Sequence, residues 1–182
     1  MTRNRNTGNP IRWSYLILSI ILWSIVIGWM WVIFLFSSES GFASFERSQM
    51  LLEFMDKHLN VSISHFILRK AAHFIEYAIL TLLSFSSFAA SSRISAHNPL
   101  VEIPVREMIS SFQTNALLSI WITVLFAVID EYHQIFVYGR NASVIDVLIG
   151  IAGGILILLL LRLSVFILTL PKKRSDSSDL QE

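Results

Sequence analysis

The longest uninterrupted apolar run of the sequence, residues 13–36, contains no charged side chain. As an α-helix rising about 1.5 Å per residue, it would reach about 36 Å, enough to cross a hydrocarbon core of about 30 Å. A cleavable signal sequence is the alternative, because Gly41-Phe42-Ala43 resembles a cleavage site. The run is longer than the apolar part of such signals, which is about 7–15 residues. We therefore expect a retained membrane-spanning helix.

The composition of the chain also indicates a membrane protein. Of its 182 residues, 54% are hydrophobic and 15% are charged, whereas soluble domains carry about 25% charged residues. The length suits one domain, which we place at residues 1–170. A net charge of +1 without a basic stripe argues against a nucleic-acid partner. The absence of Cys excludes thiol catalysis, disulfides and Cys-ligated zinc.

Three further segments, 71–90, 116–136 and 146–170, are apolar enough to be spans. The purely apolar part of the third, 116–129, is too short to cross a membrane, which takes about 20 residues. Its helix must continue through the polar residues 130–134 or stop inside the membrane. The fourth segment contains Arg162, whose long side chain can reach the far interface.

The connecting segments complete an all-α fold of four transmembrane helices. Residues 37–70 carry apolar side chains at helical spacing, which predicts a short amphipathic helix on the membrane surface. Residues 91–115 contain two prolines and an amphipathic approach to the third span, residues 137–143 form a turn around Gly139, and residues 171–182 form a disordered tail. The side chains behind the two amphipathic predictions are Leu51, Phe54, Met55, His58 and Leu59, and Val105, Met108, Ile109 and Phe112.

Four spans place both termini on one side of the membrane, and the positive-inside rule assigns that side to the cytoplasm. The bacterial cytoplasmic membrane is the expected location. The Lys and Arg residues on the side of the termini are Arg3, Arg5, Arg12, Arg93, Arg106, Lys172, Lys173 and Arg174, and those on the other side are Arg47, Lys57, Arg69, Lys70 and Arg140.

Ionisable residues gather where the second span starts, the third ends and the fourth starts. Because chain direction alternates, these three ends lie on one face, which we expect to be extracytoplasmic. Charged groups inside membranes face the bundle interior, pair with one another and tend to mark functional sites. The residues in question are Arg69, Lys70, His73, Glu76 and Tyr77, then Asp130, Glu131, His133 and Gln134, then Gly139, Arg140 and Asp146.

Helical spacing refines this picture. Arg69, His73, Glu76 and Tyr77 share one stripe of the second span, and Asp130, His133 and Gln134 share one stripe of the third. Glu131 is expected to face partly away. A structural network in which Arg69, Lys70 and Arg140 neutralise Glu76, Asp130 and Asp146 is the alternative to a site. For Lys70 and Glu131, a solvated position at the interface is also open.

The fourth span carries Gly150, Gly153 and Gly154. The small residues at positions 150 and 154 are separated by three residues, a spacing typical of close helix packing. We therefore expect this face of the span to pack against another helix, in this chain or in a partner.

Four parts of the sequence resemble the VanZ-like family. They are the string from Arg69 to Tyr77, the string Asp130-Glu131-x-His133-Gln134-x-Phe136-x-x-Gly139-Arg140, and Asp146, with Phe36-Ser37-Ser38 at the end of the first span. The resemblance extends from about residue 13 to residue 161. It implies a small bacterial inner-membrane protein of a family linked to low-level teicoplanin resistance. One departure is Gly150, where the family usually has Asn.

Three hypotheses follow for the site. In the first, it recognises a membrane lipid or a lipid-linked envelope precursor, or a glycopeptide-related ligand, and the ligand-binding candidates are Arg69, Lys70, Tyr77, Glu131, Gln134, Gly139, Arg140 and Asp146. In the second, it is an enzyme that uses acid–base or metal chemistry on a lipid-linked substrate, with His73, Glu76, Asp130 and His133 as the catalytic candidates. In the third, the chain is a structural or regulatory partner of another membrane protein. We expect no cofactor and no metal, since no span carries a closed set of metal ligands and an ion would need ligands from two spans.

Overall fold

The computed structural model describes residues 11–60, 63–94 and 112–169. Within these ranges the chain is all helical, with α1 (Trp13–Ser38), α2 (Gly41–Leu59), α3 (His65–Ser91), α5 (Phe112–Gln134) and α6 (Val144–Thr169) and no strand. All except α2 are long and apolar enough to cross a membrane. The predicted fold class of four spans and one additional amphipathic helix is confirmed.

The spans begin and end close to the predicted positions, with one clear exception. α3 begins at His65, six residues before the predicted start, because Ser64 caps it: the Ser64 hydroxyl accepts a hydrogen bond from the Ile67 N–H at 3.3 Å. Arg69 and Lys70 are therefore helical. α5 continues through the polar residues to Gln134 rather than stopping at Ile129. The predicted approach over residues 105–111 and the tail over 171–182 lie outside the described residues.

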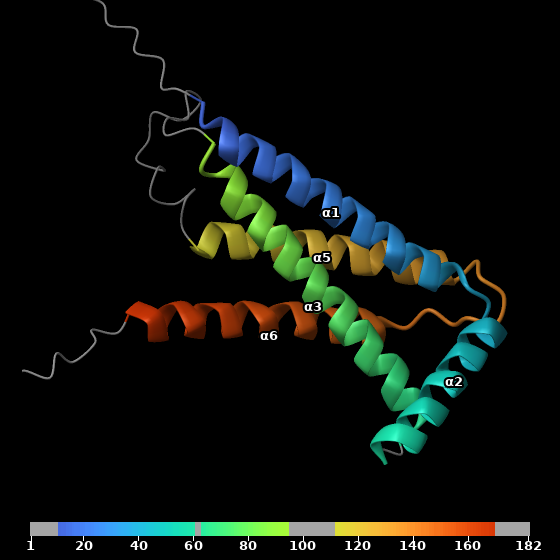
Figure 1. Cartoon of the computed structure of the whole chain (residues 1–182). Coiled ribbons are helices and arrows are strands. Elements are labelled where there is room, and N and C mark those ends of the chain that lie inside the picture. The colour runs from blue at the N-terminus through green and yellow to red at the C-terminus, as the bar shows by residue number, and fades with distance from the viewer. Residues whose placement is uncertain (1–10, 61–62, 95–111, 170–182) are drawn as a thin grey trace, which may run out of the picture.

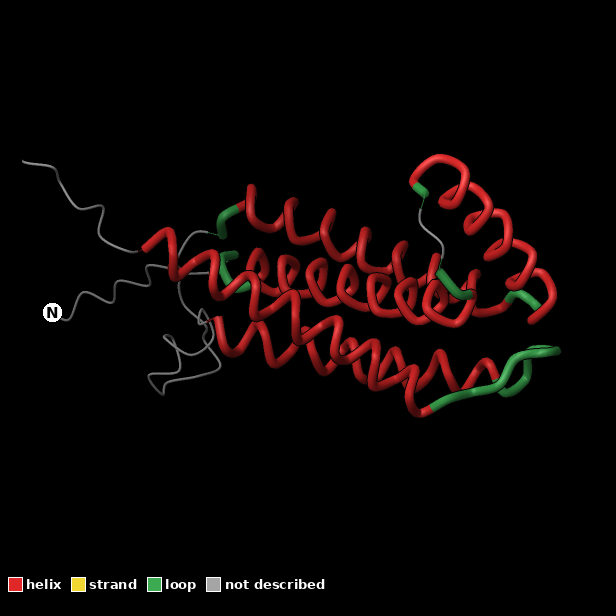
Figure 2. The backbone as a smooth tube through the Cα atoms, turned by 90° about the horizontal axis from the view of Figure 1, so that it is seen from below, coloured by secondary structure: helices red, strands yellow, loops and turns green. Residues whose placement is uncertain are grey.

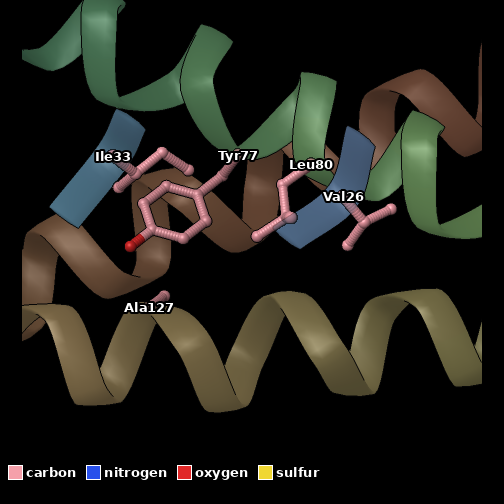
Figure 3. Close-up of a cluster of buried hydrophobic side chains, with 5 residues drawn as sticks. All are labelled: Val26, Ile33, Tyr77, Leu80 and Ala127. Carbon is pink, nitrogen blue, oxygen red and sulfur yellow. The ribbon is translucent and has the colours of Figure 1, made fainter. Parts of the chain in front are cut away.

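α3 is the central helix and packs against each of the other four (Figure 1). It runs diagonally across α5 and α6, while α1 lies on its other side (Figure 1). A small core of buried side chains from α1, α3 and α5 fills the centre, and Figure 3 shows its members: Val26, Ile33, Tyr77, Leu80 and Ala127. Most other large apolar side chains are exposed on the outside of the bundle, as expected where helices face lipid.

Hydroxyl groups replace much of the apolar core between the helices. The Thr81 and Thr123 hydroxyls of α3 and α5 lie 2.7 Å apart, and those of Ser19 and Ser91 of α1 and α3 also lie 2.7 Å apart. All four side chains are wholly or partly buried. Small hydroxyl residues let membrane helices approach closely and hydrogen-bond across the contact. These pairs therefore hold α1, α3 and α5 together.

The three glycines of α6 face α3 of the same chain. A Cβ atom at Gly150 would lie 2.8 Å from the Tyr77 ring, one at Gly154 would lie 2.5 Å from the Thr81 hydroxyl, and one at Gly153 would collide with the Phe74 backbone carbonyl. These glycines therefore permit the close contact between α3 and α6, which brings the start of α6 beside the first turns of α3.

α2 lies at one end of the bundle, beside the end of α1 and the start of α3 (Figures 1 and 2). It begins at a Ser40 cap, whose hydroxyl accepts from the Ala43 N–H at 3.3 Å, and ends at Asn60 in the left-handed conformation. The predicted helix in this connection is confirmed. Its large apolar side chains, Phe42, Phe45, Met50, Leu51, Phe54 and Leu59, are exposed. That this face lies on the membrane surface stays a prediction.

Candidate functional site

The end of α1, the start of α3, the end of α5 and the start of α6 lie at one end of the bundle, together with α2 (Figures 1 and 2). We call this the polar end. Alternation of chain direction predicts this arrangement for the last three of these helix ends, and the structure has it. The turn between α5 and α6, residues 135–143, returns the chain across the same end. The side chains that interrupt the apolar pattern of the spans are thus brought together.

Asp146 in the first turn of α6 is neutralised by two cations from α3. Its carboxylate forms an ion pair with the Lys70 ammonium and lies 3.7 Å from the Arg69 guanidinium. The Asp146 side chain is 7% exposed and that of Lys70 is 15% exposed. A carboxylate is also favoured near a helix N-terminus. These contacts join α3 to α6, and they show that Lys70 is not a solvated interfacial residue.

A second cluster, which we call the buried cluster, consists of His73, Asp130 and Glu131. One nitrogen or oxygen from each lies within 4.8 Å of the others. The His73 Nε2 atom is 3.8 Å from the Glu131 Oε1 atom. Within the described part of the chain, neither carboxylate forms an ion pair with a Lys or Arg side chain. The buried cluster therefore joins α3 to α5 without a neutralising cation.

The prediction that Glu131 faces partly away is wrong. Its side chain is 6% exposed and points to His73. One carboxylate oxygen, Oε2, accepts a hydrogen bond from the Ser143 N–H at 2.7 Å, just before α6. Successive residues of a helix differ by about 100° in direction. Because α3 and α6 both cover this side of α5, Asp130 and Glu131 can both face the interior, and the solvated alternative for Glu131 is excluded as well.

The buried cluster is held by neighbouring groups. Gln134 donates a hydrogen bond to the Asp130 Oδ2 atom at 3.3 Å, and the His73 Nδ1 atom lies 3.9 Å from the Glu76 carboxylate. The opposite atoms of the three side chains, His73 Nε2, Asp130 Oδ1 and Glu131 Oε1, are buried without hydrogen-bond partners. Each carboxylate is thus held by one hydrogen bond, and each of the three side chains has a second polar atom without a partner in the described structure.

Tyr77 lies one turn deeper along α3 than His73 and is completely buried. Its ring centroid is 4.7 Å from that of His73, and its side chain extends from α3 toward α5 (Figure 3). Its hydroxyl lies near the Asp130 side chain without forming a well-aligned hydrogen bond within the described structure. Gly150 packs directly on this ring. The departure from the family pattern at position 150 therefore places the α6 backbone against Tyr77, where a side chain would collide.

A cavity of about 150 Å³ opens beside the buried cluster, which is room for several water molecules. Three arginines from three different elements line it: Arg47 of α2, Arg69 of α3 and Arg140 of the turn after α5. We call them the arginine set. Its other polar lining residues are Ser37, Ser44, Ser48, His73, Glu76, Asp130 and Gln134. The cavity thus combines guanidinium groups with two carboxylates and an imidazole.

Arg140 fixes the turn against the end of α1. Its guanidinium donates to the Phe36 carbonyl at 2.8 Å and to the Glu39 carbonyl at 3.1 Å. Burial, followed by repulsion from Arg69 and Arg47, lowers the pKa of Arg140 from its ordinary value, while Glu39 and Asp130 act in the opposite direction. Arg remains charged after such a shift. The three guanidinium groups belong to residues that line one cavity.

Six predicted site residues do not line this cavity: Lys70, Tyr77, Glu131, His133, Gly139 and Asp146. His133 packs its ring against Phe34 of α1, with 4.6 Å between ring centroids, and is separate from the buried cluster. Gly139 adopts a positive φ of 74° and its backbone packs against that of Gly41, where an added Cβ would collide. The backbone carbonyl of Tyr138 accepts a hydrogen bond from the Gly41 N–H at 3.0 Å. Gly139 is therefore required to join this turn to the start of α2.

Four polar lining residues were not among the predicted site residues: Ser37, Ser44, Arg47 and Ser48. Arg47 lies on α2, where a single cation on an amphipathic helix is typical of a solvated face, so the pattern contains no signal for it. Ser37 is buried with an unpartnered hydroxyl at the cavity. It occurs in the Phe36-Ser37-Ser38 string that resembles the VanZ-like pattern, which was a signal of its importance.

The geometry therefore offers guanidinium groups for an anion, and imidazole and carboxylate groups for acid–base chemistry or for a cation. No curated protein and no solved structure matches the chain. The VanZ/LLP1 family model matches residues 22–167, which include all of α2, α3 and α5 and most of α1 and α6. The chain is thus a membrane protein that belongs to the VanZ/LLP1 family.

Proposed function

We propose that the polar end recognises the anionic head group of an envelope lipid. The observation that carries this proposal is the arginine set, in which three guanidinium groups from three elements converge on one cavity. Guanidinium binds phosphate and carboxylate through two parallel hydrogen bonds, which gives geometric selectivity. The ligand class follows from this chemistry.

The surroundings of the arginine set support a lipid rather than a soluble anion. The four long helices are apolar on their outer faces, so the cavity lies at the end of membrane spans. α2 exposes Phe42, Phe45 and Met50 beside it. A lipid would leave its acyl chains in the bilayer while its head group enters the cavity, where Glu76 and Asp130 can hold amines or sugar hydroxyls.

The orientation belongs to the same proposal. We place both termini in the cytoplasm of a bacterium and the polar end outside, because Lys and Arg are more numerous on the side of the termini. The absence of Cys makes this testable by single substitutions. Lys57→Cys on α2 should react with a membrane-impermeant maleimide in intact cells, and Ser14→Cys at the start of α1 only after permeabilisation. The reverse pattern would show the opposite orientation.

Binding is tested with purified full-length protein in a neutral detergent. Phosphatidylglycerol and phosphatidylcholine are added separately, and retained lipid is measured by native mass spectrometry. We expect selective retention of phosphatidylglycerol, and a loss of about tenfold in affinity, about 1.4 kcal/mol, for Arg47→Gln and for Arg69→Gln.

The matched control is Lys57→Gln, which removes an exposed cation of α2 that does not line the cavity. Inorganic phosphate is added as a competitor to separate a lipid ligand from a free anion. Equal retention by wild type and both arginine variants would refute the proposal, and so would complete displacement of the lipid by phosphate at matched concentration.

Altered teicoplanin susceptibility is a finer part of the proposal, suggested by the family resemblance. We expect a susceptible host that expresses the chain to tolerate more teicoplanin than the same host expressing Arg47→Gln at equal protein level. Equal growth inhibition in the two hosts would remove this part and leave head-group recognition standing.

An enzyme acting on a lipid-linked substrate is the second candidate function, favoured by the buried cluster beside the cavity. His73 and Asp130 both line the cavity and so can reach a bound group. An acid–base role for His73, with Glu76 beside it, predicts that His73→Gln abolishes turnover but leaves head-group binding intact. If the buried cluster only stabilises the fold, the wild-type protein should show no turnover of a lipid-linked substrate.

A further inference from the structure

Among the described residues, no Lys or Arg side chain forms an ion pair with the buried cluster, although the cluster contains two carboxylates in the interior of a helix bundle. A buried carboxylate costs several kcal/mol unless it is paired, protonated or bound to a metal. The nearest pair of cations, Lys70 and Arg69, is already engaged by Asp146. Within the described residues, the His73 imidazole is the one basic group in salt-bridge range of Glu131, and none lies in that range of Asp130.

The free atoms of the buried cluster converge. Within the described structure, His73 Nε2, Asp130 Oδ1 and Glu131 Oε1 are each buried without a hydrogen-bond partner, and each of the three residues offers one ligand atom within 4.8 Å of the others. Ligands that bind one zinc ion at about 2.0–2.2 Å lie about 3.4 Å apart in a tetrahedral arrangement. The 3.8 Å between His73 Nε2 and Glu131 Oε1 needs only a small side-chain adjustment to reach that separation.

The other polar atoms of these three side chains contact neighbouring groups, as the ligands of known metal sites do. Asp130 is held by Gln134, Glu131 by the Ser143 N–H, and the His73 Nδ1 atom faces the Glu76 carboxylate. In metal sites the distal nitrogen of a His ligand usually faces a carboxylate or carbonyl, and ligating carboxylates are themselves hydrogen-bonded. This arrangement fixes the ring and both carboxylates before any ion binds.

We infer that His73, Asp130 and Glu131 bind one divalent transition-metal ion, of the class of Zn²⁺ or Mn²⁺. One imidazole and two carboxylates are ligands that both ions accept, and three protein ligands leave a position open for water or a ligand. His73 and Asp130 line the cavity, so this position is open to it. The sequence predicts no metal because no single span carries a closed ligand set, and it requires ligands from two spans for an ion to bind; here the three candidate ligands come from α3 and α5. The inference does not depend on head-group recognition.

The test uses purified full-length protein in detergent, stripped with a chelator and dialysed against ZnCl₂ or MnCl₂. Metal per chain is measured by inductively coupled plasma mass spectrometry, and affinity by titration calorimetry. We expect one ion per chain in wild type. Affinity should fall by more than about tenfold in Asp130→Asn, Glu131→Gln and His73→Gln, because loss of outer groups alone costs about 10–100-fold. Gln134→Leu removes only the hydrogen bond to Asp130, so it should lower the metal affinity by less than the three ligand variants do.

Matched controls separate this site from surface binding. Asp56→Asn and His58→Gln remove an exposed carboxylate and an exposed imidazole of α2 and should leave the stoichiometry unchanged. Arg47→Gln should also retain the ion, so failure of the metal inference is distinguishable from failure of the head-group proposal.

Thermal unfolding provides a second readout that is independent of stoichiometry. A ligand that binds only the folded state raises the melting temperature. The ion should therefore raise it in wild type and not in Glu131→Gln, even where that variant is well folded. No bound ion in wild type would overturn the inference and indicate that the carboxylates are neutralised by protons. Equal binding by wild type and all three ligand variants would overturn it as well.

Discussion

Asp146 and Glu131 are both buried carboxylates at the polar end, but one is neutralised and the other is not. Asp146 has Lys70 and Arg69 within ion-pair distance, and its contacts join α6 to α3. Among the described residues, Glu131 has His73 at 3.8 Å and the Ser143 N–H as its polar contacts, and no Lys or Arg in ion-pair range. Part of the predicted salt-bridge network, the pairing of Asp146 with Lys70 and Arg69, is therefore present beside the candidate site, and Arg69 belongs to both.

The difference indicates how a membrane bundle can position reactive groups. Charges that hold helices together must be satisfied within the chain, because lipid offers no compensation. Charges left unsatisfied in the interior are costly, and such groups tend to mark functional sites. We therefore assign the Asp146 ion pair to stability and the buried cluster, with the cavity beside it, to ligand binding.

The largest expected effect comes from breaking the neutralised pair. Asp146→Asn leaves the Lys70 ammonium, 15% exposed, without a carboxylate. Removing one partner of a buried ion pair costs about 3–5 kcal/mol, and we expect about 3 kcal/mol because this pair is not fully enclosed. Denaturant unfolding in detergent micelles measures it. The double variant Lys70→Met/Asp146→Leu should recover most of the loss. A single variant as stable as wild type would break the comparison.

Arg140 is a cation that hydrogen bonds to the end of α1 hold in place, and its contacts can be compared with the Asp146 ion pair. Arg140→Gln removes two charged hydrogen bonds to the carbonyls of Phe36 and Glu39. Each such bond is worth about 1.5–3 kcal/mol when buried, and partial exposure reduces this to about 1.5 kcal/mol in total. The unfolding free energy should fall by that amount. A larger loss of unfolding free energy than for Asp146→Asn would show that the Arg140 hydrogen bonds stabilise the fold more than the Asp146 ion pair does.

Arg47 is the exposed member of the arginine set and gives a smaller effect on stability. Its guanidinium lies 2.5 Å from the Glu39 carboxylate, with the side chain 44% exposed. Exposed ion pairs contribute about 0–1 kcal/mol. Arg47→Gln should therefore change the unfolding free energy by about 0.5 kcal/mol or less while it weakens lipid retention. Loss of stability in proportion to loss of binding would show that Arg47 acts through the fold.

The spans and their convergence could be predicted from sequence because both follow from local rules. Apolar run length identifies the helices, and alternation of direction brings residue 69, residue 130 and residue 146 to one end. The inward direction of Glu131 could not be predicted this way, since it depends on α3 and α6 covering the same side of α5. That contact depends on Gly153 and the Phe74 carbonyl, which are far apart in sequence.

The cavity was less predictable than the helices. Arg47 reaches it because the chain reverses between α1 and α2 and α2 packs on α3. No periodicity within α2 indicates that reversal. The same limit applies to the buried cluster, whose three ligand atoms come from two spans and meet only in the folded bundle.

Asp146 is neutralised by nearby cations whereas Glu131 is not, and one paired measurement tests this difference most directly. Unfolding free energies of metal-free Asp146→Asn and Glu131→Gln are compared with wild type in the same detergent. Gln retains an oxygen for the Ser143 N–H and removes an uncompensated charge, so we expect Glu131→Gln to be as stable as wild type or more stable. Asp146→Asn should lose about 3 kcal/mol. Equal destabilisation by both substitutions would contradict the division.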